Sequence, residues 1–331
     1  YSGEPGWVNE EAGSKRRPNF QGVNPCAEIL LDSKGLCNLT TVNVMAFVRD
    51  GVLDHDGLME AQRLGARAGY RMTCTELEIP EWNAVQQRDK LLGCSLTGWQ
   101  DMVNALSLAR EDQEKLLRDL REAAKKAAAE YAKELGQPEP LLVTTVKPEG
   151  TLSLLPVVSS GAHFSHAPYY VRRIRISSDD PLTKVCEELG YPVFPEVGQD
   201  PETCVTKVVE FPVKAPGARF KADVGAIEQL GIYKMFMTHY ADHNCSITIH
   251  VRDEEWDDVE QWVWDNWDDT VALSFLSFED NFYELLPFEE ITEEEYQKRA
   301  KAMNPFIPSL ISKYEKEETE YDIGDDGCEN G

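Results

Sequence analysis

The segment Asn24-Pro25-Cys26-Ala27-Glu28 (NPCAE) places one cysteine two residues from a carboxamide and two residues from a carboxylate. If this segment is extended, the three polar side chains point to the same side, because side chains alternate along an extended chain. The carboxamide can then hold a substrate hydroxyl, the carboxylate can accept its proton, and the thiol can act on the same small molecule. This stretch is therefore the candidate catalytic centre of the chain.

The surroundings of Cys26 favour one-electron chemistry over nucleophilic catalysis. A nucleophilic cysteine needs a histidine base, and no histidine lies near Cys26 in the sequence. The neighbouring carboxylate of Glu28 also disfavours a thiolate. The alternative is a small buried apolar cysteine, the usual role of an isolated cysteine. The LCNL segment (36–39) argues against this alternative, because the segment supplies a second sulfur at Cys37. We expect Cys26 to act as a thiol that loses a hydrogen atom.

Length, charge and cysteine use limit the class of protein. The 331 residues fit one large domain or two smaller ones, and a net charge of −26 disfavours nucleic acid polymers and anionic membranes as partners. We see no signal peptide and no apolar run near the roughly 18 residues of a membrane span. The eight cysteines form no CxxC pair, which indicates a reduced, cytoplasmic protein without a metal site. Because the chain begins at Tyr1, we expect a fragment, a processed product or a trimmed sequence.

Helical and strand patterns alternate along the chain, which predicts an α/β fold. The strongest helix is expected at 111–135, where helix-forming residues end at Gly136. Further elements are expected as strands at 169–176 and 245–251, as helices at 181–189 and 227–239, and as an acidic helix within 253–271. The tryptophans of that acidic helix are expected to lie partly in the core, at positions 256, 262, 264 and 267.

Four segments together resemble the ribonucleotide reductases, and the form Asn-Pro-Cys-x-Glu resembles their adenosylcobalamin-dependent class II in particular. The first segment is NPCAEILL with LCNLTTVNV, which is similar to the active-site finger loop and the strand that follows it. The second is KPEGTLSLLPVVSSGAHFSHAPYYVRRIRI at 147–176, which is similar to the segment that binds substrate phosphate. NCSITIHV and NWDDTVALSFL resemble later barrel segments. The resemblance runs from about Gly3 to Cys328.

The resemblance implies a role for each residue of the candidate centre. Cys26 corresponds to the thiyl-radical cysteine that removes the ribose 3′ hydrogen, and Glu28 to the base for the 3′ hydroxyl. Asn24 corresponds to the residue that hydrogen-bonds the ribose hydroxyls. Cys37 corresponds to one half of the cysteine pair that reduces the 2′ carbon and ends as a disulfide. Cys328 corresponds to one of the mobile tail cysteines that reduce this pair again.

The phosphate segment also has a physical argument of its own. Gly, Thr and Ser residues follow a β-branched run and precede an apolar run. If a helix begins there, its unpaired N–H groups and its positive end suit a phosphate, although a plain strand-to-helix turn would have the same sequence. The residues expected to bind phosphate are Pro148, Glu149, Gly150, Thr151, Leu152 and Ser153.

The resemblance implies a ten-stranded α/β barrel of the ribonucleotide reductase and glycyl-radical type, with a central finger loop at 22–31. This chain would be the C-terminal part of the barrel over 1–310, followed by a flexible acidic tail at 311–331. The implied reaction is radical reduction of ribonucleotides, preferably ribonucleoside triphosphates, to 2′-deoxyribonucleotides. The implied cofactor is adenosylcobalamin, and the implied reductant is thioredoxin or a similar dithiol.

The chain departs from the family pattern in ways that leave alternatives open. The other cysteine of the reducing pair lies upstream of the finger loop in the family, and no cysteine precedes Cys26 here. We therefore expect a missing N-terminal half and an inactive fragment. The alternatives are a non-catalytic half that only completes a barrel, a reductase of another radical class, and a glycyl-radical lyase. Basic residues at 172, 173 and 175 either lie near nucleotide phosphates or form a solvated face.

Overall fold

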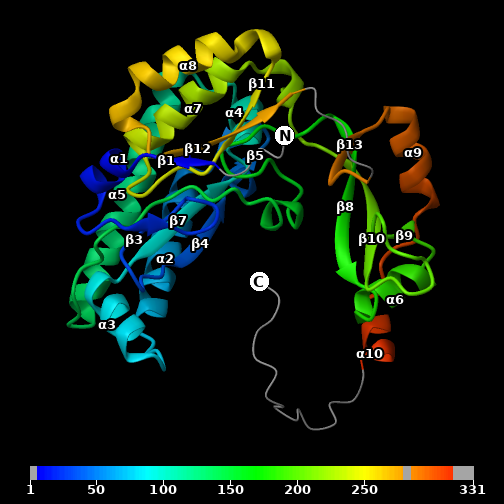
Figure 1. The fold of residues 1–331 in the computed structure, drawn as a ribbon, viewed down its shortest axis with the longest axis horizontal. Helices are drawn as coiled ribbons and strands as arrows, with labels where there is room; N and C mark the ends of the chain where they lie inside the picture. The colour runs from blue at the N-terminus through cyan, green and yellow to red at the C-terminus, as the bar shows by residue number, and fades with distance from the viewer. Residues whose placement is uncertain (1–5, 279–284, 316–331) are drawn as a thin grey trace. The chain divides into compact units, whose positions relative to one another are not determined.

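A computed structural model describes residues 6–278 and 285–315, which fall into two compact units (Figure 1). The first unit comprises the chain up to Pro168 together with Ala215–Asp280. The second comprises Tyr169–Lys214 and the chain from Asn281 onward. The length of the chain allows one large domain or two smaller ones, but the sequence does not predict where this division falls inside 1–310. The expected redox cysteine of the tail, Cys328, lies outside the described residues.

Parallel strand pairs form the centre of the first unit. β4 (Asn38–Asn43) pairs in parallel with β7 (Leu92–Thr97). β11 (Thr248–Val251) pairs in parallel with β12 (Ala272–Ser277), and β1 (Trp7–Val8) lies antiparallel on the other side of β12. With the surrounding helices these pairs make the α/β fold that the sequence predicts. Among the described residues the paired strands do not close into a barrel.

Two isolated parallel bridges connect these strand pairs. Cys94 of β7 bridges to Thr144, and Val146 bridges to Cys245 just before β11. The segment 142–146 therefore runs between the two pairs, and extended segments follow one another from β4 to β12. The strand expected over 245–251 is regular only at Thr248–Val251, because Cys245 makes a single bridge.

Helices cover the strands of the first unit. α5 (Arg110–Glu134) confirms the expected helix at 111–135, and Gly136 follows it with a φ of +63° that favours glycine. Its buried alanines pack with Ala66 and Tyr70 of α2 (His55–Thr73), which also contacts β4 and β7. Small side chains let these two helices approach closely.

The first unit contains further helices and several two-residue strands. They are α1 (Glu10–Arg16), β2 (Gly22–Val23), β3 (Leu30–Leu31), β5 (Val48–Arg49), β6 (Val52–Leu53), α3 (Pro80–Asp89), α4 (Trp99–Leu106), α7 (Ala226–His239) and α8 (Trp256–Asp265). α7 confirms the helix expected at 227–239. Across residues 6–278 and 285–315, no helix combines the length and the apolar content needed to cross a bilayer.

The second unit is an antiparallel sheet with helices. Its strand order is β13 (Phe288–Glu290), β8 (Tyr169–Ser177), β10 (Thr206–Lys214) and β9 (Val193–Pro195). β8 confirms the strand expected at 169–176. The helices are α6 (Pro181–Glu188), α9 (Glu293–Ala302) and α10 (Ile311–Tyr314), and α6 confirms the helix expected at 181–189.

Carboxylates of the second unit pair with arginines of β8. The buried guanidinium of Arg173 contacts Glu210 at 2.7 Å and Glu289 at 2.5 Å, and Arg175 pairs with Glu196. These two arginines are therefore ion-paired within the sheet.

The tryptophans of α8 and the turn after it differ from the expectation. Trp262 packs against the core, but Trp264 is 77% exposed, and Trp256 and Trp267 are also exposed. Trp267 stacks on Trp7 with ring centroids 5.3 Å apart. The expectation of partial core burial is wrong for Trp264, because its side chain lies on the solvent side of the helix.

Candidate functional site

The NPCAE motif forms the tip of a short hairpin. β2 and β3 pair in antiparallel fashion, with Val23 opposite Leu30. The Ala27 amide donates to the Asn24 carbonyl at 2.8 Å, and Ala27 has a left-handed φ of +58°. The side chain of Asn24 accepts from the Ile29 amide at 2.9 Å. The premise of an extended segment is therefore wrong, because the chain turns at this point.

A cavity of about 520 Å³ lies against this hairpin tip. Asn24 and the exposed Cys26 line it together with Pro148, the first residue of the expected phosphate segment. The lining also includes Ser246, which precedes β11, and Thr248, its first residue. Three of the residues singled out from the sequence thus border one space large enough for a small molecule.

Glu28 points into the protein interior. The residue is only 3% exposed, and its carbonyl oxygen accepts from Thr145 Oγ1 at 2.6 Å and from the Asn244 amide at 3.2 Å. Its carboxylate oxygen Oε2 is buried without a hydrogen-bond partner among the described residues. Such an oxygen retains the capacity to accept a hydrogen bond from a bound hydroxyl group.

Cys37 is partly buried just before β4 and packs against the core. Burial raises the pKa of its thiol well above the usual value, and Cys94 and the Glu28 carboxylate raise it further. The thiol of Cys37 and the carboxylate of Glu28 are thus close enough to interact electrostatically. Cys37 is therefore a protonated thiol at neutral pH.

The expected phosphate segment contains one helical turn instead of a helix start. The 3₁₀ turn covers Leu152–Leu154, and the Ser153 amide donates to the Glu149 carbonyl at 3.0 Å. Gly150, Thr151 and Leu152 are exposed. A turn of this length does not provide the row of aligned, unpaired amides that the start of a helix would offer to a phosphate.

The side chain of Glu149 faces the interior instead of the solvent. It is buried, accepts from Thr41 Oγ1 at 2.7 Å and lies 3.8 Å from Lys147 Nζ. The backbone at Gly161 packs closely against this segment, so that a Cβ at this position would collide with the Lys147 carbonyl. Glu149 thus connects the segment to β4.

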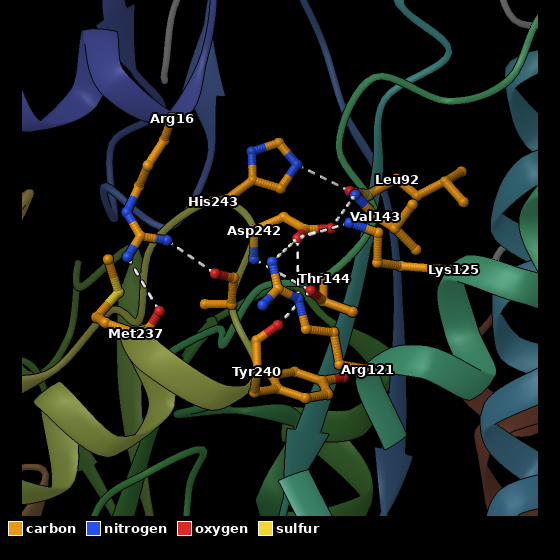
Figure 2. Close-up of polar contacts among 11 residues, drawn as sticks. Arg16, Leu92, Arg121, Lys125, Val143, Thr144, Met237, Tyr240, Asp242 and His243 are labelled. Carbon is orange, nitrogen blue, oxygen red and sulfur yellow. Dashed lines mark hydrogen bonds and ion pairs between the residues drawn. The ribbon is translucent and has the colours of Figure 1, made fainter. Parts of the chain in front are cut away.

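Sequence reasoning missed a polar turn at 242–244 that contacts the hairpin. Asp242 accepts from Arg121 at 2.5 Å, lies 3.3 Å from Lys125 Nζ, and accepts from the Val143 amide at 3.2 Å (Figure 2). Burial opposes the ionisation of Asp242, but the two cations outweigh it and lower the pKa of the carboxyl. The available signal was an Asp-His-Asn run between an apolar helix and a β-branched strand.

Comparisons with known proteins identify the family of the chain. The family model described as "Ribonucleotide reductase, barrel domain" matches residues 2–179. The adenosylcobalamin-dependent ribonucleoside-triphosphate reductase of Lactobacillus leichmannii is 28% identical over 370 residues, which cover 100% of this chain and 49% of the relative. The chain therefore spans about half the length of the curated relatives that it matches.

Solved structures give the same answer. A B12-dependent class II ribonucleotide reductase superposes with a TM-score of 0.78 at 26% identity, covering 94% of this chain and 48% of that structure. The class Id ribonucleotide reductase alpha subunit of Actinobacillus ureae shares the fold, with a TM-score of 0.55 at 16% identity over 85% of this chain and 59% of that structure. The family model covers more than half of the chain. The chain belongs to the ribonucleotide reductase family.

Proposed function

We propose that this chain carries the radical-bearing part of an adenosylcobalamin-dependent reductase that converts ribonucleotides, preferably ribonucleoside triphosphates, to 2′-deoxyribonucleotides. The observation that carries the proposal is the cavity shared by Asn24, Cys26 and Pro148. The proposal is supported because Cys26 and the proposed hydroxyl-binding residue Asn24 border the same space as Pro148, the first residue of the proposed phosphate segment.

The finer architecture is part of this proposal. Residues 22–31 would be the finger loop of a ten-stranded barrel, with 1–310 as its C-terminal part and 311–331 as its tail. The extended segments that follow one another in parallel from β4 through 142–146 to β12 support this proposal, because they would form half of the wall of such a barrel. The hairpin tip lies against this run, because Thr145 Oγ1 and the Asn244 amide both donate to the Glu28 carbonyl.

In this proposal, Cys26, Glu28 and Asn24 share the first half of the reaction. A thiyl radical on Cys26 would take the 3′ hydrogen atom, which leaves a carbon radical and restores the thiol. The buried Oε2 of Glu28 would take the proton of the 3′ hydroxyl. Because the Ile29 amide occupies Oδ1 of Asn24, the NH₂ group of that side chain would donate to the substrate.

The second half of the reaction needs two electrons and two protons. Cys37 and a second cysteine would supply both, so that the 2′ hydroxyl leaves as water and the two sulfurs form a disulfide. The Cys26 thiol would then return its hydrogen atom to the 3′ carbon and become a thiyl radical again. The raised pKa of Cys37 suits this role, because the proton stays on the sulfur until the reaction requires it. Thioredoxin or a similar dithiol would restore the pair, with Cys328 as the proposed relay.

The proposed phosphate segment comprises Pro148, Glu149, Gly150, Thr151, Leu152 and Ser153. The structure gives these residues different surroundings. Pro148 borders the cavity, and Gly150–Leu152 are exposed next to it in sequence. Glu149 would hold the segment through Thr41 and would not contact phosphate itself, since two anions repel.

The cofactor proposal rests on the class of the relatives and on Cys26. When bound, adenosylcobalamin supplies the radical that removes the hydrogen atom from this thiol. The thiol is exposed at a cavity wall, so it is accessible to such a group. The described residues hold no group of three His, Cys, Asp or Glu side chains suited to a metal ion. In this proposal the corrin ring, and no protein side-chain cluster, carries the cobalt.

The test is to combine this chain with a candidate N-terminal half and to measure reduction of ribonucleoside triphosphates with adenosylcobalamin and a dithiol. Activity that disappears in Cys26→Ala would support the reaction and the cofactor. Activity only with a diiron subunit would overturn the class. Equal activity of Cys26→Ala would favour a non-catalytic, barrel-completing role.

A further inference from the structure

We propose that His243 and Asn244 are positioning residues that fix the NPCAE hairpin at its place beside the cavity. This inference rests on the proposed function, because it concerns the same site. Both residues are fully buried, and both contact the backbone of the hairpin directly. They lie more than 200 residues from the hairpin in sequence, with separations of 213 and 217 for the two contacts.

His243 joins the hairpin to the central strands. Its Nδ1 lies 3.1 Å from the amide of Leu30 in β3, and its Nε2 lies 2.9 Å from the carbonyl oxygen of Leu92 in β7. An amide can only donate and a carbonyl can only accept, so the ring must be neutral with its hydrogen on Nε2. A neutral imidazole is the side chain that satisfies both groups at once.

Asn244 holds the tip of the hairpin. Its Nδ2 donates to the Ala27 carbonyl at 2.8 Å, and its own amide donates to the Glu28 carbonyl at 3.2 Å. The carboxamide has only one suitable orientation. Tyr233 OH accepts from the Val271 amide at 2.9 Å and therefore donates its own hydrogen to Asn244 Oδ1, also at 2.9 Å.

The turn that carries both residues is itself anchored. Asp242 contacts Arg121 and Lys125 of α5 through its carboxylate, and its amide donates to the Thr144 carbonyl at 2.9 Å (Figure 2). The turn thus fixes the position of the hairpin relative to α5 and to the segment 142–146. An anchored turn can transmit a fixed position, which a mobile turn could not.

These contacts flank the two reactive groups. Asn244 holds Ala27, the residue after Cys26, and it also holds the backbone of Glu28, while His243 holds Leu30 two residues further on. Catalytic groups must keep their geometry within about 0.5 Å. The loss of either contact would let the thiol and the carboxylate move relative to a substrate held by other parts of the site.

The test compares His243→Phe and Asn244→Ala with Gln62→Leu. Gln62 is a matched control, since it is buried and bonds to Tyr240 OH without touching the hairpin. Hydrogen exchange of the 331-residue chain should become on the order of tenfold faster at residues 22–31 in both test variants, relative to the control. Exchange at 22–31 that is no faster than in the control would overturn the inference, whatever the enzyme does.

Kinetics of the assembled enzyme give the second measurement. Both test variants should lower kcat by roughly 10- to 100-fold with little change in KM, since misplacement of about 1 Å costs about that much. Gln62→Leu should leave kcat nearly unchanged. An equal loss of kcat in the control would overturn the positioning role. Faster exchange at 22–31, with a wild-type enzyme that reduces no nucleotide, would instead overturn the proposed function alone.

Discussion

A Cβ atom built on Gly93 would lie 3.2 Å from Cys37 Sγ, so the thiol of Cys37 lies directly against the backbone of β7. The same Cβ would lie 3.2 Å from Ile29 Cδ1 in the hairpin and would overlap with Leu39. Gly93 therefore provides the space in which Cys37 lies beside the hairpin. Its role is steric.

The substitution Gly93→Ala should lower the free energy of unfolding by about 1–3 kcal/mol, because an extra methyl group overpacks a buried site. Denaturant unfolding of the chain measures this change. Gly231→Ala in α7 is the control: a Cβ there meets no atom within 4 Å, and alanine favours a helix. A loss in the control as large as that in Gly93→Ala would contradict the steric explanation.

The buried histidines should make the folded chain less stable in acid. Burial lowers the pKa of His243 to about 4, while an unfolded histidine has a pKa of about 6.5. Between these values the unfolded chain binds more protons than the folded chain. The contribution of His243 to the free energy of unfolding is therefore fully present above about pH 6.5, and it is lost as the pH falls toward 4.

The loss assigned to His243 is on the order of 3 kcal/mol. Urea unfolding at several pH values between 7 and 4.5 measures it. Burial also lowers the pKa of His250, to about 3, and of His166, to about 4, so the wild-type slope contains several contributions. His243→Phe should reduce the slope, whatever its effect on the stability at pH 7. An unchanged slope would show that His243 does not take up a proton on unfolding.

The sequence predicts the parts of this molecule that depend on local pattern. α5 and β8 follow from helix-forming composition and from alternation, and the NPCAE motif with the segments that accompany it indicates the family. Contacts between distant segments could not be predicted in this way. The bond between Leu30 and His243 spans 213 residues, and only the parallel arrangement of the central segments brings its two ends together.

The orientations of two side chains could not be predicted from the sequence, for the same physical reason. Glu149 belongs to the proposed phosphate segment, but its side chain turns inward to Thr41 of β4. Trp264 was expected to be partly in the core, but it is exposed. The type of residue shows whether a side chain is able to be buried or to bind a ligand. The residues that other elements place around it decide which of the two occurs.

Asp242 should be important for stability, because it is buried and ion-paired. Asp242→Asn removes the charged hydrogen bonds that the buried carboxylate accepts from Arg121 and Lys125, and because both cations are partly exposed the loss should be about 1–3 kcal/mol. Thermal or urea unfolding at neutral pH measures the loss. The control is Glu134→Gln, which breaks an exposed pair with Arg67 and should have a much smaller effect. Similar losses in both variants would contradict the assignment.

The two cysteines of the site should differ sharply in reactivity. Cys26 is exposed, whereas Cys37 is partly buried and burial raises the pKa of its thiol. Iodoacetamide reacts with the thiolate, so at pH 8 it should modify Cys26 at least about tenfold faster than Cys37. Mass spectrometry of the peptides after timed labelling measures both rates, and labelling in urea should make them similar.

Equal labelling of the two cysteines in the folded chain would show that Cys37 is more accessible than its surroundings indicate. It would also weaken the proposed reaction, in which Cys37 keeps its proton until the 2′ hydroxyl leaves. Gly93→Ala sharpens the test, because it should displace the Cys37 thiol and change its labelling rate while Cys26 keeps its own. A change at Cys26 alone would instead locate the disturbance in the hairpin.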